Sequence, residues 1–525
     1  MRGTCAVAGI AVLAVVGAGV PGVMSGAAAD RSGSPDLSRY YTQKIKWAAC
    51  EGETEAMAEA TGHAKDVRCG KVRVPIDYAE PGGGDVEVAM IRMKSSGSGE
   101  PRGSLLLNFG GPGGPGVSAL AGSQKEFGFL SKDYDIVSFD PRGVGQSDPV
   151  SCGDLGTGPL DSGLGEQSDD PGAVLAELRK AAKECEDKSG PVLPHMGTVN
   201  VSRDLDVMRQ ALGDKKLNYL GFSYGTRLGA VYAAQFPKKV GRMVLDGVDT
   251  LTDPVAEQSL ATVEGRQTAL DNFLDWCTGN AGCVFGADAR AARDGMVKLI
   301  QDMDAMPLRS MEGEEFTGQD VVGVLSQALY SRQAWPALSQ ALGALLADGD
   351  PRALIRMSGG LMGGVDTDGP RVDVPMDNMS AALMAVNCAD DPDRPDAARI
   401  EKEVGKLRTE FEEASPVFGK SMLMPVLLCF GRPAGTDYIR ERVRDVKTPK
   451  LLLVGTRGDP ATPYRWTEET ARRLGSQAVV LDNKGDGHTG YLGSVCVHDK
   501  VNGFLLYGET PKSGSSCPVD PKAQE

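Results

Sequence analysis

Basic residues are in short supply in this 525-residue chain. Its 56 Lys and Arg stand against 71 Asp and Glu, and the formal net charge is −15. Such a chain lacks the positive surface that attracts nucleic acids and anionic membranes, so we expect neither as a partner. Glycine and proline together stay below the roughly 25–30% typical of low-complexity chains. With 41% hydrophobic and 24% charged residues, the composition is that of an ordinary globular protein.

Metal-binding patterns are also missing. The chain has only four histidines, and it contains neither a Cys-x-x-Cys pair nor a His-Glu-x-x-His sequence. Because zinc sites are recognised in sequences by closely spaced ligands of these types, we expect no metal. No pattern in the sequence calls for a cofactor.

Long apolar runs are absent except at the amino terminus. Arg2 precedes an uncharged run at residues 6–20, and the alanines at 27–29 offer small residues for cleavage before Asp30. A membrane span needs about 18–20 strongly apolar residues, whereas this run is shorter and rich in alanine and glycine. It therefore predicts a signal peptide over residues 1–29. The mature protein is expected to be secreted, extracellular and free of membrane attachment.

The cysteine count agrees with export. One of the eleven cysteines, Cys5, falls within the signal peptide, which leaves an even number in the mature chain. An even number in an oxidising compartment indicates disulfides. The ten remaining cysteines are Cys50, Cys69, Cys152, Cys185, Cys277, Cys283, Cys388, Cys429, Cys496 and Cys517.

Strand-like and helical patterns alternate in the first half of the mature chain, lapse, and then resume. This alternation predicts an α/β fold with a mostly parallel sheet covered by helices on both faces. Helical patterns predominate from about 250 to 445, and such an insertion would sit at the strand ends, where open α/β sheets bind ligands. The expected divisions are a mobile lead-in at 30–45, a first core segment at 46–250, a helical cap at 251–445, and a second core segment with a disulfide-bonded tail at 446–525.

A Gly-x-Ser-x-Gly motif spans residues 221–225, with Ser223 at its centre. A strand-like segment, Lys216–Phe222, precedes the serine, and a helical pattern follows it. This is the context of a nucleophile elbow, in which a sharp turn lifts the serine hydroxyl above the sheet. The sequence therefore predicts Ser223 as a nucleophile.

A serine hydroxyl needs a base to take its proton. His488 lies among glycines at 485–490, which favours a loop after the strand-like segment that ends at Leu481. His498 is the rival, but it falls in an expected helix beyond that loop. Chain order favours His488 as the base, because the base follows the nucleophile and the acid in hydrolases that carry this motif.

An acid must orient the histidine and stabilise its imidazolium form. Asp459 follows the apolar run at 451–455 and so lies at the carboxyl end of an expected strand. Asp486 and Asp482 are rivals that lie closer to the histidine in sequence. With Asp459 the order is Ser, Asp, His, which is that of the α/β-hydrolase fold.

The developing oxyanion needs backbone N–H donors. One is expected from Tyr224, directly after the nucleophile. The other is expected from the glycine-rich loop at 110–116, with Gly111 as the first choice and Gly110 as the second. No Gly-Lys-Ser/Thr follows this loop, so a phosphate-binding loop is not favoured.

Together these motifs resemble a known family. The segments 108–116 (NFGGPGGPG), 140–147 (DPRGVGQS), 221–226 (GFSYGT) and 485–488 (GDGH) are similar to those of the secreted bacterial tripeptidyl aminopeptidases. These belong to the proline iminopeptidase-like group of serine α/β-hydrolases. The resemblance spans nearly all of the mature chain. It departs at Phe109, where proline iminopeptidases carry histidine, so this loop does not establish proline specificity.

The resemblance implies a serine exopeptidase without a cofactor that releases short peptides, expected to be tripeptides, from free N-termini. Peptides are then its substrates, and a monomer is expected. Three carboxylates are candidates for holding the substrate's ammonium group: Asp390 and Asp391, within a segment that resembles a family motif, and Asp249. The resemblance also favours disulfides between neighbouring cysteines: Cys50–Cys69, Cys152–Cys185, Cys277–Cys283, Cys388–Cys429 and Cys496–Cys517.

Two other functions stay open from the sequence. A secreted carboxylesterase would use the same three residues without requiring an amine in its substrate. A catalytically inactive binding protein is disfavoured, because Ser223, Asp459 and His488 are all present.

Overall fold

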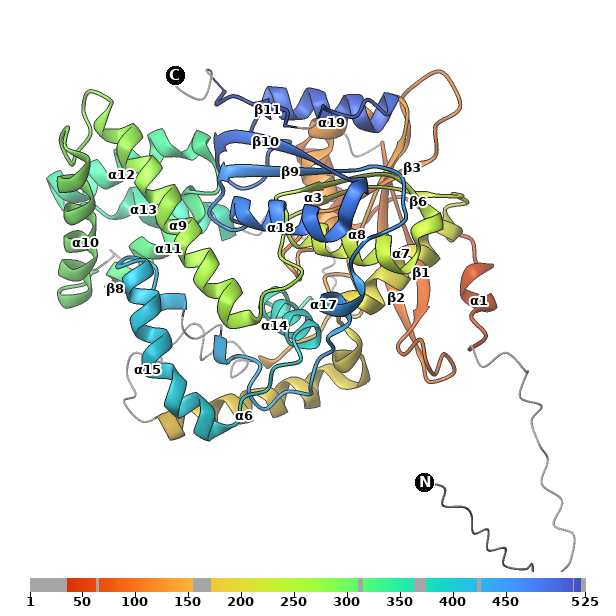
Figure 1. Ribbon diagram of the computed structural model, residues 1–525, viewed down its shortest axis with the longest axis horizontal. Coiled ribbons are helices and arrows are strands. Elements are labelled where there is room, and N and C mark those ends of the chain that lie inside the picture. Colours follow the sequence, from red (N-terminus) through yellow and green to blue (C-terminus); the bar gives the residue numbers. More distant parts are fainter. Residues whose placement is uncertain are drawn as a thin grey trace, which may run out of the picture.

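The computed structural model describes residues 35–62, 66–153, 171–309, 315–362, 374–422, 426–512 and 514–520 (Figure 1). The expected signal peptide, 1–29, and the start of the expected lead-in, 30–34, lie outside the described residues. Among the helices of the described residues, none is long and apolar enough to cross a membrane.

A twisted nine-stranded sheet forms the centre of the molecule. Its spatial order is β1-β2-β4-β3-β5-β6-β9-β10-β11; β1 and β2 pair antiparallel, as do β2 and β4, and the remaining pairs are parallel. The expected mostly parallel sheet of an α/β-hydrolase is therefore confirmed. The strands are β1 (Val67–Pro75), β2 (Asp85–Met93), β3 (Ser104–Asn108), β4 (Asp135–Phe139), β5 (Leu217–Phe222), β6 (Val240–Asp246), β9 (Leu451–Gly458), β10 (Ala478–Asp486) and β11 (Ser516–Cys517).

Helices cover both faces of the sheet, because the central strands are apolar on both sides. Every residue of β3 is buried, and successive side chains point to opposite faces. Leu105 and Leu107 share a core with α3 (Gly116–Ser123) and α19 (Val495–Tyr507). Leu106 instead belongs to the core on the other face, which includes α7 (Thr198–Ala211), α8 (Tyr224–Gln235) and the end of α18 (Tyr464–Leu474).

The chain between β6 and β9 builds a helical region beside the sheet (Figure 1). Its helices α9 to α13 pack around a core of their own, which includes Phe273, Leu325 and Trp335. A short hairpin of β7 (Leu308–Arg309) and β8 (Glu315–Phe316) interrupts the helices. The helices are α9 (Val255–Thr278), α10 (Ala289–Ala305), α11 (Gly318–Ala328), α12 (Trp335–Asp348), α13 (Arg352–Met362), α14 (Asn378–Asp390), α15 (Ala397–Ala414) and α17 (Tyr438–Arg442).

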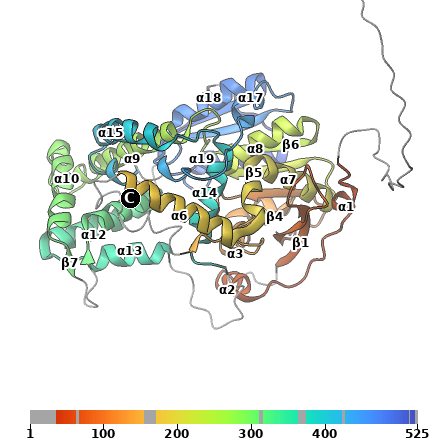
Figure 2. The ribbon, with the colours of Figure 1, turned by 90° about the horizontal axis from the view of Figure 1, so that it is seen from below.

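Helix α14 packs differently from α9 to α13, as do Ile400 of α15 and Ile439 of α17. Its buried residues, among them Ala381, Ala382 and Val386, belong to the core beneath the sheet and not to that of α9 to α13. Conversely, α6 (Pro171–Ser189), which precedes β5 in the chain, extends from the sheet towards α15 (Figure 2). The cap and the sheet domain are thus interleaved on this side of the molecule.

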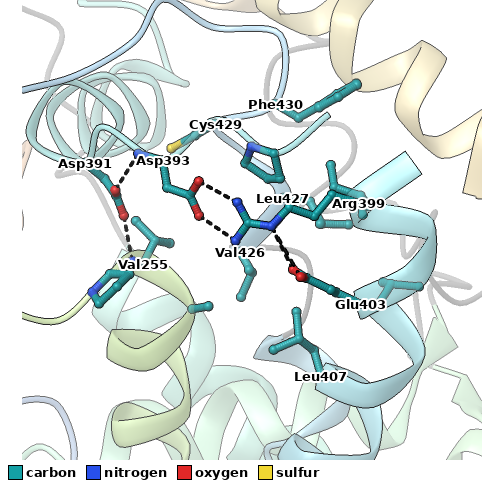
Figure 3. Close-up of a pocket in the computed structure, with 15 residues that line it drawn as sticks. Val255, Asp391, Asp393, Arg399, Glu403, Leu407, Val426, Leu427, Cys429 and Phe430 are labelled. Carbon is teal, nitrogen blue, oxygen red and sulfur yellow. Dashed lines mark hydrogen bonds and ion pairs between the residues drawn. The ribbon is translucent and has the colours of Figure 1, made fainter. Parts of the chain in front are cut away.

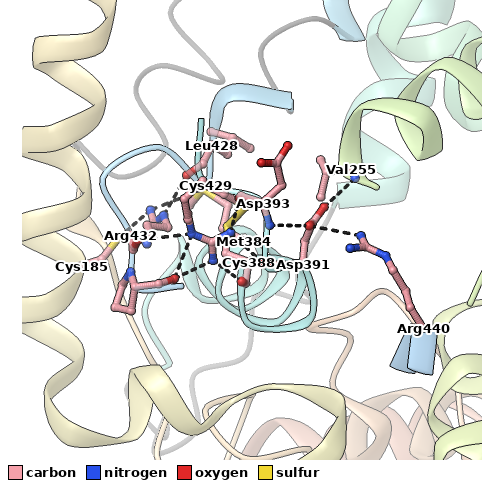
Figure 4. Close-up of a disulfide and its surroundings, with 12 residues drawn as sticks. Cys185, Val255, Met384, Cys388, Asp391, Asp393, Leu428, Cys429, Arg432 and Arg440 are labelled. Carbon is pink, nitrogen blue, oxygen red and sulfur yellow. Dashed lines mark hydrogen bonds and ion pairs between the residues drawn. A yellow bond between two sulfur atoms is a disulfide. The ribbon is translucent and has the colours of Figure 1, made fainter. Parts of the chain in front are cut away.

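Five disulfides join the ten cysteines: Cys50–Cys69, Cys152–Cys185, Cys277–Cys283, Cys388–Cys429 and Cys496–Cys517. These are the pairs between sequence neighbours that the family resemblance favours. Cys388–Cys429 ties the end of α14 to the segment that follows α15, and Arg432 of that segment approaches the sulfur of Cys185 to 3.2 Å (Figure 4). Such cross-links stabilise the fold mainly by restricting the unfolded chain.

A fully buried ion pair fastens the loop after β4. Arg142 donates from Nε to Asp204 of α7 at 2.7 Å and from Nη2 at 2.6 Å, and its remaining donors reach the carbonyl oxygens of Pro75, Ile76 and His195. The side chains of Arg142 and Asp204 are 0% and 1% exposed. Because every guanidinium donor direction is used inside the protein, Arg142 organises its loop and is not free to contact a substrate.

Replacing Arg142 is expected to destabilise the fold strongly. In Arg142→Met the Asp204 carboxylate stays buried without its partner, which costs about 3–5 kcal/mol in the free energy of unfolding. Urea unfolding of the two proteins measures the difference. The matched control is Arg102→Met, which breaks the half-exposed pair with Asp133 and is expected to cost about 0–1 kcal/mol. Similar losses in the two variants would contradict the prediction.

Candidate active site

Ser223 occupies a strained turn between β5 and α8. Its φ of 55° and ψ of −127° lie in a region that residues other than glycine rarely adopt. The two motif glycines make the turn possible: a Cβ on Gly221 would lie 2.5 Å from the carbonyl oxygen of Gly225, and a Cβ on Gly225 would lie 2.7 Å from that of Asn108. The serine therefore has the backbone geometry of a nucleophile elbow.

His488 and Asp459 face each other across a hydrogen bond. The Nδ1 atom of His488 lies 2.9 Å from Oδ1 and 3.0 Å from Oδ2 of Asp459. The parallel pairing of β9 and β10 explains this meeting, because it sets Gly458 beside Asp486 and so brings together the loops that follow. The Asp459 side chain is 0% exposed and that of His488 is 12% exposed.

Asp459 is held by more than the histidine. Its carboxylate accepts hydrogen bonds from the amides of Ala461, Thr462 and Thr489 and from the hydroxyl of Thr462 at 2.9 Å. Burial alone would raise the pKa of Asp459, but the His488 charge and these hydrogen bonds outweigh it and lower the pKa. Thr462 was not singled out in the sequence, although an Asp side chain that accepts from backbone amides a few residues on is a common local pattern.

The rival acids and the rival base have other partners. Asp486 pairs with Arg332 and accepts from Asn272 at 2.8 Å, and Asp482 forms a two-pronged pair with Arg457. His498 lies on α19, where its ring is within 3.3 Å of the Asn502 amide. Neither rival acid is among the hydrogen-bond partners of His488 in the described part of the chain.

The pKa of His488 is raised above its usual value of 6.5. Burial by itself lowers this pKa, because it disfavours the imidazolium form. The charge of Asp459 and its hydrogen bond act in the opposite direction, helped by the charges of Asp246 and Asp249, and together they prevail. The site therefore stabilises a proton on the imidazole.

Asp246, at the end of β6, was not singled out in the sequence and connects the two halves of the site. Its carbonyl oxygen accepts the Ser223 amide at 2.9 Å, and its carboxylate accepts the amides of Gly490 and Tyr491, just beyond the histidine. Burial raises the pKa of Asp246 to about 6, although these two amides oppose the rise. Its position at a strand's carboxyl end was the available signal.

The glycine-rich loop after β3 lies directly against the elbow. A Cβ on Gly110 would meet the Ser223 Cβ at 2.9 Å and the Tyr224 amide nitrogen at 3.3 Å. The Tyr224 amide is at the first position of α8, where backbone N–H groups have no acceptor within the helix. Gly110 is a wrong choice as an oxyanion donor, because its amide already donates to Oδ1 of Asn108 at 3.1 Å. Gly111 therefore remains the candidate in this loop.

All three carboxylates expected to hold an ammonium group have partners inside the protein, and two of them are also almost fully buried. Asp390 accepts from the Thr198 amide at 2.8 Å and from its hydroxyl at 2.5 Å, and it lies 3.6 Å from Arg227. The expectation for Asp390 is therefore wrong, because its carboxylate is buried and hydrogen-bonded to α7.

The expectation that Asp391 binds the substrate's ammonium group is also wrong. Asp391 accepts from the amides of Val255 and Asp393 and pairs with Arg440 at 3.2 Å (Figure 4). These contacts join α14 to α9 and α17. Asp249 differs from both, because its side chain keeps 12% exposure while it pairs with Arg227 at 3.0 Å.

A small cavity lies between the start of α9, α15 and the segment 426–430 (Figure 3). It measures about 70 Å³, and Arg399 on its wall pairs with Asp393 and Glu403. Its lining in the described chain includes none of Ser223, Asp459 and His488, so it is separate from the candidate active site. Within the described ranges, no cluster of three or more His, Cys, Asp or Glu side chains is placed to hold a metal ion.

Comparison with known proteins gives a consistent set of relatives. Residues 415–517 match a protein family described as TAP-like protein. The chain is 32% identical to the serine protease Hip1 of Mycobacterium tuberculosis over 97% of this chain and 96% of that protein. It is 32% identical to a tripeptidyl aminopeptidase of Streptomyces lividans over 86% and 84% of the two chains. It is 31% identical to a protein of Mycobacterium tuberculosis named carboxylesterase B over 90% and 89%.

Removing either Ser223 or His488 is expected to abolish hydrolysis. Ser223→Ala and His488→Ala should each lower the turnover of a p-nitrophenyl ester by on the order of 10⁶, because the two groups act as one unit. His498→Ala, which changes the other histidine after the serine, serves as the matched control and should keep the wild-type rate. Activity that survives in His488→Ala and disappears in His498→Ala would show that the base was wrongly assigned.

The pH dependence should reflect the raised pKa of His488. The imidazole must be neutral to accept a proton, so the rate falls as the pH drops through this pKa, and the half-maximal point should lie above the ordinary 6.5. In Asp459→Asn the charge that raises the pKa is gone while burial remains, so the residual activity, lower by about 10⁴, should titrate at a lower pH. Initial rates between pH 4 and pH 9 measure both. A half-maximal point that rises in Asp459→Asn would contradict this explanation.

Proposed function

The chain belongs to the TAP-like family of serine α/β-hydrolases, which includes tripeptidyl aminopeptidase, and from this we propose that it is a secreted serine exopeptidase. Its reaction is the release of short peptides, most simply tripeptides, from free N-termini. The observation that carries the proposal is the strained Ser223 turn together with the hydrogen-bonded pair of His488 and Asp459. The relatives named as a serine protease and as a tripeptidyl aminopeptidase support a peptide substrate.

The proposed reaction proceeds through an acyl-enzyme. The Ser223 hydroxyl attacks the scissile carbonyl carbon while His488 takes its proton, and the amides of Tyr224 and Gly111 stabilise the resulting oxyanion. His488 then gives the proton to the leaving amine as the C–N bond breaks. A water molecule loses a proton to His488 and attacks the ester, and Ser223 recovers its proton when the N-terminal fragment leaves.

Secretion is part of the proposal. Five disulfides persist only where thiols are not kept reduced, which favours an extracellular environment. The expected signal peptide at 1–29 would deliver the chain there.

Asp249 is the proposed anchor for the substrate's ammonium group. It follows β6 directly, its charge acts on His488, and its side chain is the one of the three candidates that keeps more than a tenth of its surface exposed. An acyl fragment bound to Ser223 that reaches back to Asp249 would have a defined length. This would restrict cleavage to positions near a free N-terminus.

A carboxylesterase is the second candidate function. It is favoured by the relative named carboxylesterase B, which covers 90% of this chain at 31% identity. Such an enzyme would use the same serine, histidine and aspartate without needing an ammonium anchor.

Acetylating the substrate's N-terminus distinguishes the two functions. A charge-assisted contact to Asp249 is worth about 1.5–3 kcal/mol, or about 10- to 150-fold in rate. A free-amine tripeptide anilide should therefore be cleaved at least about tenfold faster than its N-acetyl form. Equal rates, together with rapid hydrolysis of a butyrate ester, would transfer the assignment to the esterase.

Asp249→Asn tests the anchor in the same assay. At a pH well above the pKa of His488, where loss of the Asp249 charge no longer changes the protonation of the base, Asp249→Asn should slow cleavage of the free-amine anilide and leave the acetylated one unchanged, so that the difference between the two substrates disappears. The matched control is Asp437→Asn, at a carboxylate directly before α17 that is 52% exposed, which should preserve the difference. If Asp249→Asn preserves it as well, another group holds the ammonium.

A further inference from the structure

The turn after α11 brings a cap residue onto the catalytic histidine. The ring of Tyr330 packs edge-on against the imidazole of His488, with the centroids 4.9 Å apart and the planes at 70°. The carbonyl oxygen of the same residue accepts the His488 amide at 2.8 Å. Tyr330 therefore fixes both the backbone and the ring of His488, although it lies 158 positions away in the chain.

The glycine next to His488 shows how closely the turn at Tyr330 approaches the histidine loop. Gly487 has a φ of +97°, and a Cβ built on it would lie 2.9 Å from the Tyr330 carbonyl oxygen. Only glycine tolerates both this φ and this distance. The histidine loop is therefore shaped to receive the turn.

One further contact attaches the turn to a carboxylate of the histidine loop, and a second attaches α9 to the same carboxylate. Arg332, two residues beyond Tyr330, pairs with Asp486, and Asn272 of α9 donates to the other oxygen of the same carboxylate. Both Arg332 and Asp486 are largely buried, at 14% and 11% exposure. Asp486, which sequence proximity suggested as a partner for His488, instead attaches the cap to the histidine loop.

We propose that Tyr330 is a positioning residue for His488: the cap supplies the aromatic wall against which the imidazole is held in line with Asp459. Edge-to-face aromatic contacts are directional as well as apolar, so they orient a ring as well as cover it. The imidazole of His488 is then held in its catalytic orientation only when the cap packs against the histidine loop. This inference rests on the proposed function only in that both use His488 as the base.

The contact acts through the packing of the Tyr330 ring over the imidazole and not through charge. Tyr330 keeps 39% of its surface exposed, and the burial of the rest raises its pKa; the charge of Asp459 adds to the rise although Arg266 opposes it, so the phenol stays neutral. The charged groups that act on His488 are Asp459, after β9, and Asp246 and Asp249, at the end of β6 and after it. Replacing Tyr330 leaves all three carboxylates in place. Any change in the titration of His488 then reports its exposure to water.

The test compares Tyr330→Ala with Tyr330→Phe, which keeps the ring. The rate at which diisopropyl fluorophosphate labels Ser223 is measured as a function of pH, because this reaction needs the base but no peptide. Tyr330→Ala should label about 3- to 10-fold more slowly, the range of one aromatic contact. Its half-maximal point should move to higher pH, because water relieves the burial that lowers the pKa of His488. Tyr330→Phe should show the labelling rate and the half-maximal pH of the wild type.

A tyrosine outside the site provides the control. Tyr507 on α19 is 61% exposed, and Tyr507→Ala should label Ser223 like the wild type. The proposal would be overturned if Tyr330→Ala labelled Ser223 at the wild-type rate with the wild-type half-maximal pH. It would also be overturned if Tyr330→Phe lost as much labelling rate as Tyr330→Ala. A slower rate with an unshifted titration and a lower unfolding temperature would reduce Tyr330 to a structural residue. If the wild type cleaves no peptide but Tyr330→Ala still shows both effects, the exopeptidase proposal fails while this one stands.

Discussion

The backbone of Ser223 is held in a conformation that L-residues avoid, and the surrounding structure depends on keeping it there. The turn is closed by the bond from the Ser223 amide to the Asp246 carbonyl oxygen. It also needs three positions without a Cβ: Gly221, Gly225 and Gly110. Because these residues come from β5, α8 and the loop after β3, one small turn sets how closely neighbouring strands and their helix approach. A methyl group at any of the three would press on backbone atoms, which cannot move aside as a flexible side chain can.

The pairing of the strands in the sheet, and not closeness in the sequence, sets the distance between Ser223 and the His488–Asp459 pair. Asp246 accepts the Ser223 amide with its carbonyl oxygen and the amides after His488 with its carboxylate, so a single residue of β6 sets the spacing between Ser223 and the His488 loop. The parallel pairing of β9 with β10 then places Asp459 beside His488. Strand register is strongly specified wherever one face is buried, so the pairing of these strands determines where the loops that follow them begin.

The cap contributes to the site as well as covering it. Its turn at Tyr330 contacts the histidine, while Asp390 and Asp391 at the end of α14 bind α7, α9 and α17. The Cys388–Cys429 disulfide and Arg394, which donates to the carbonyl oxygens of Asp391 and Pro433, hold this junction together. Carboxylates that an exopeptidase could have presented to its substrate are thus used to attach one part of the molecule to another.

The sequence by itself determined the α/β fold, the elbow at Ser223 and the order of the serine, aspartate and histidine, because strand–helix alternation, a tight glycine turn and chain order are local signals. Tertiary structure alone decided which polar groups are already satisfied. Whether Asp390 or Asp391 is free depends on Thr198 and Val255, and both partners lie more than a hundred residues from the carboxylates they bind. The approach of Tyr330 to His488 has the same origin: no periodicity marks which turn of a helical insertion will meet a loop of the sheet, since packing between distant segments sets that contact.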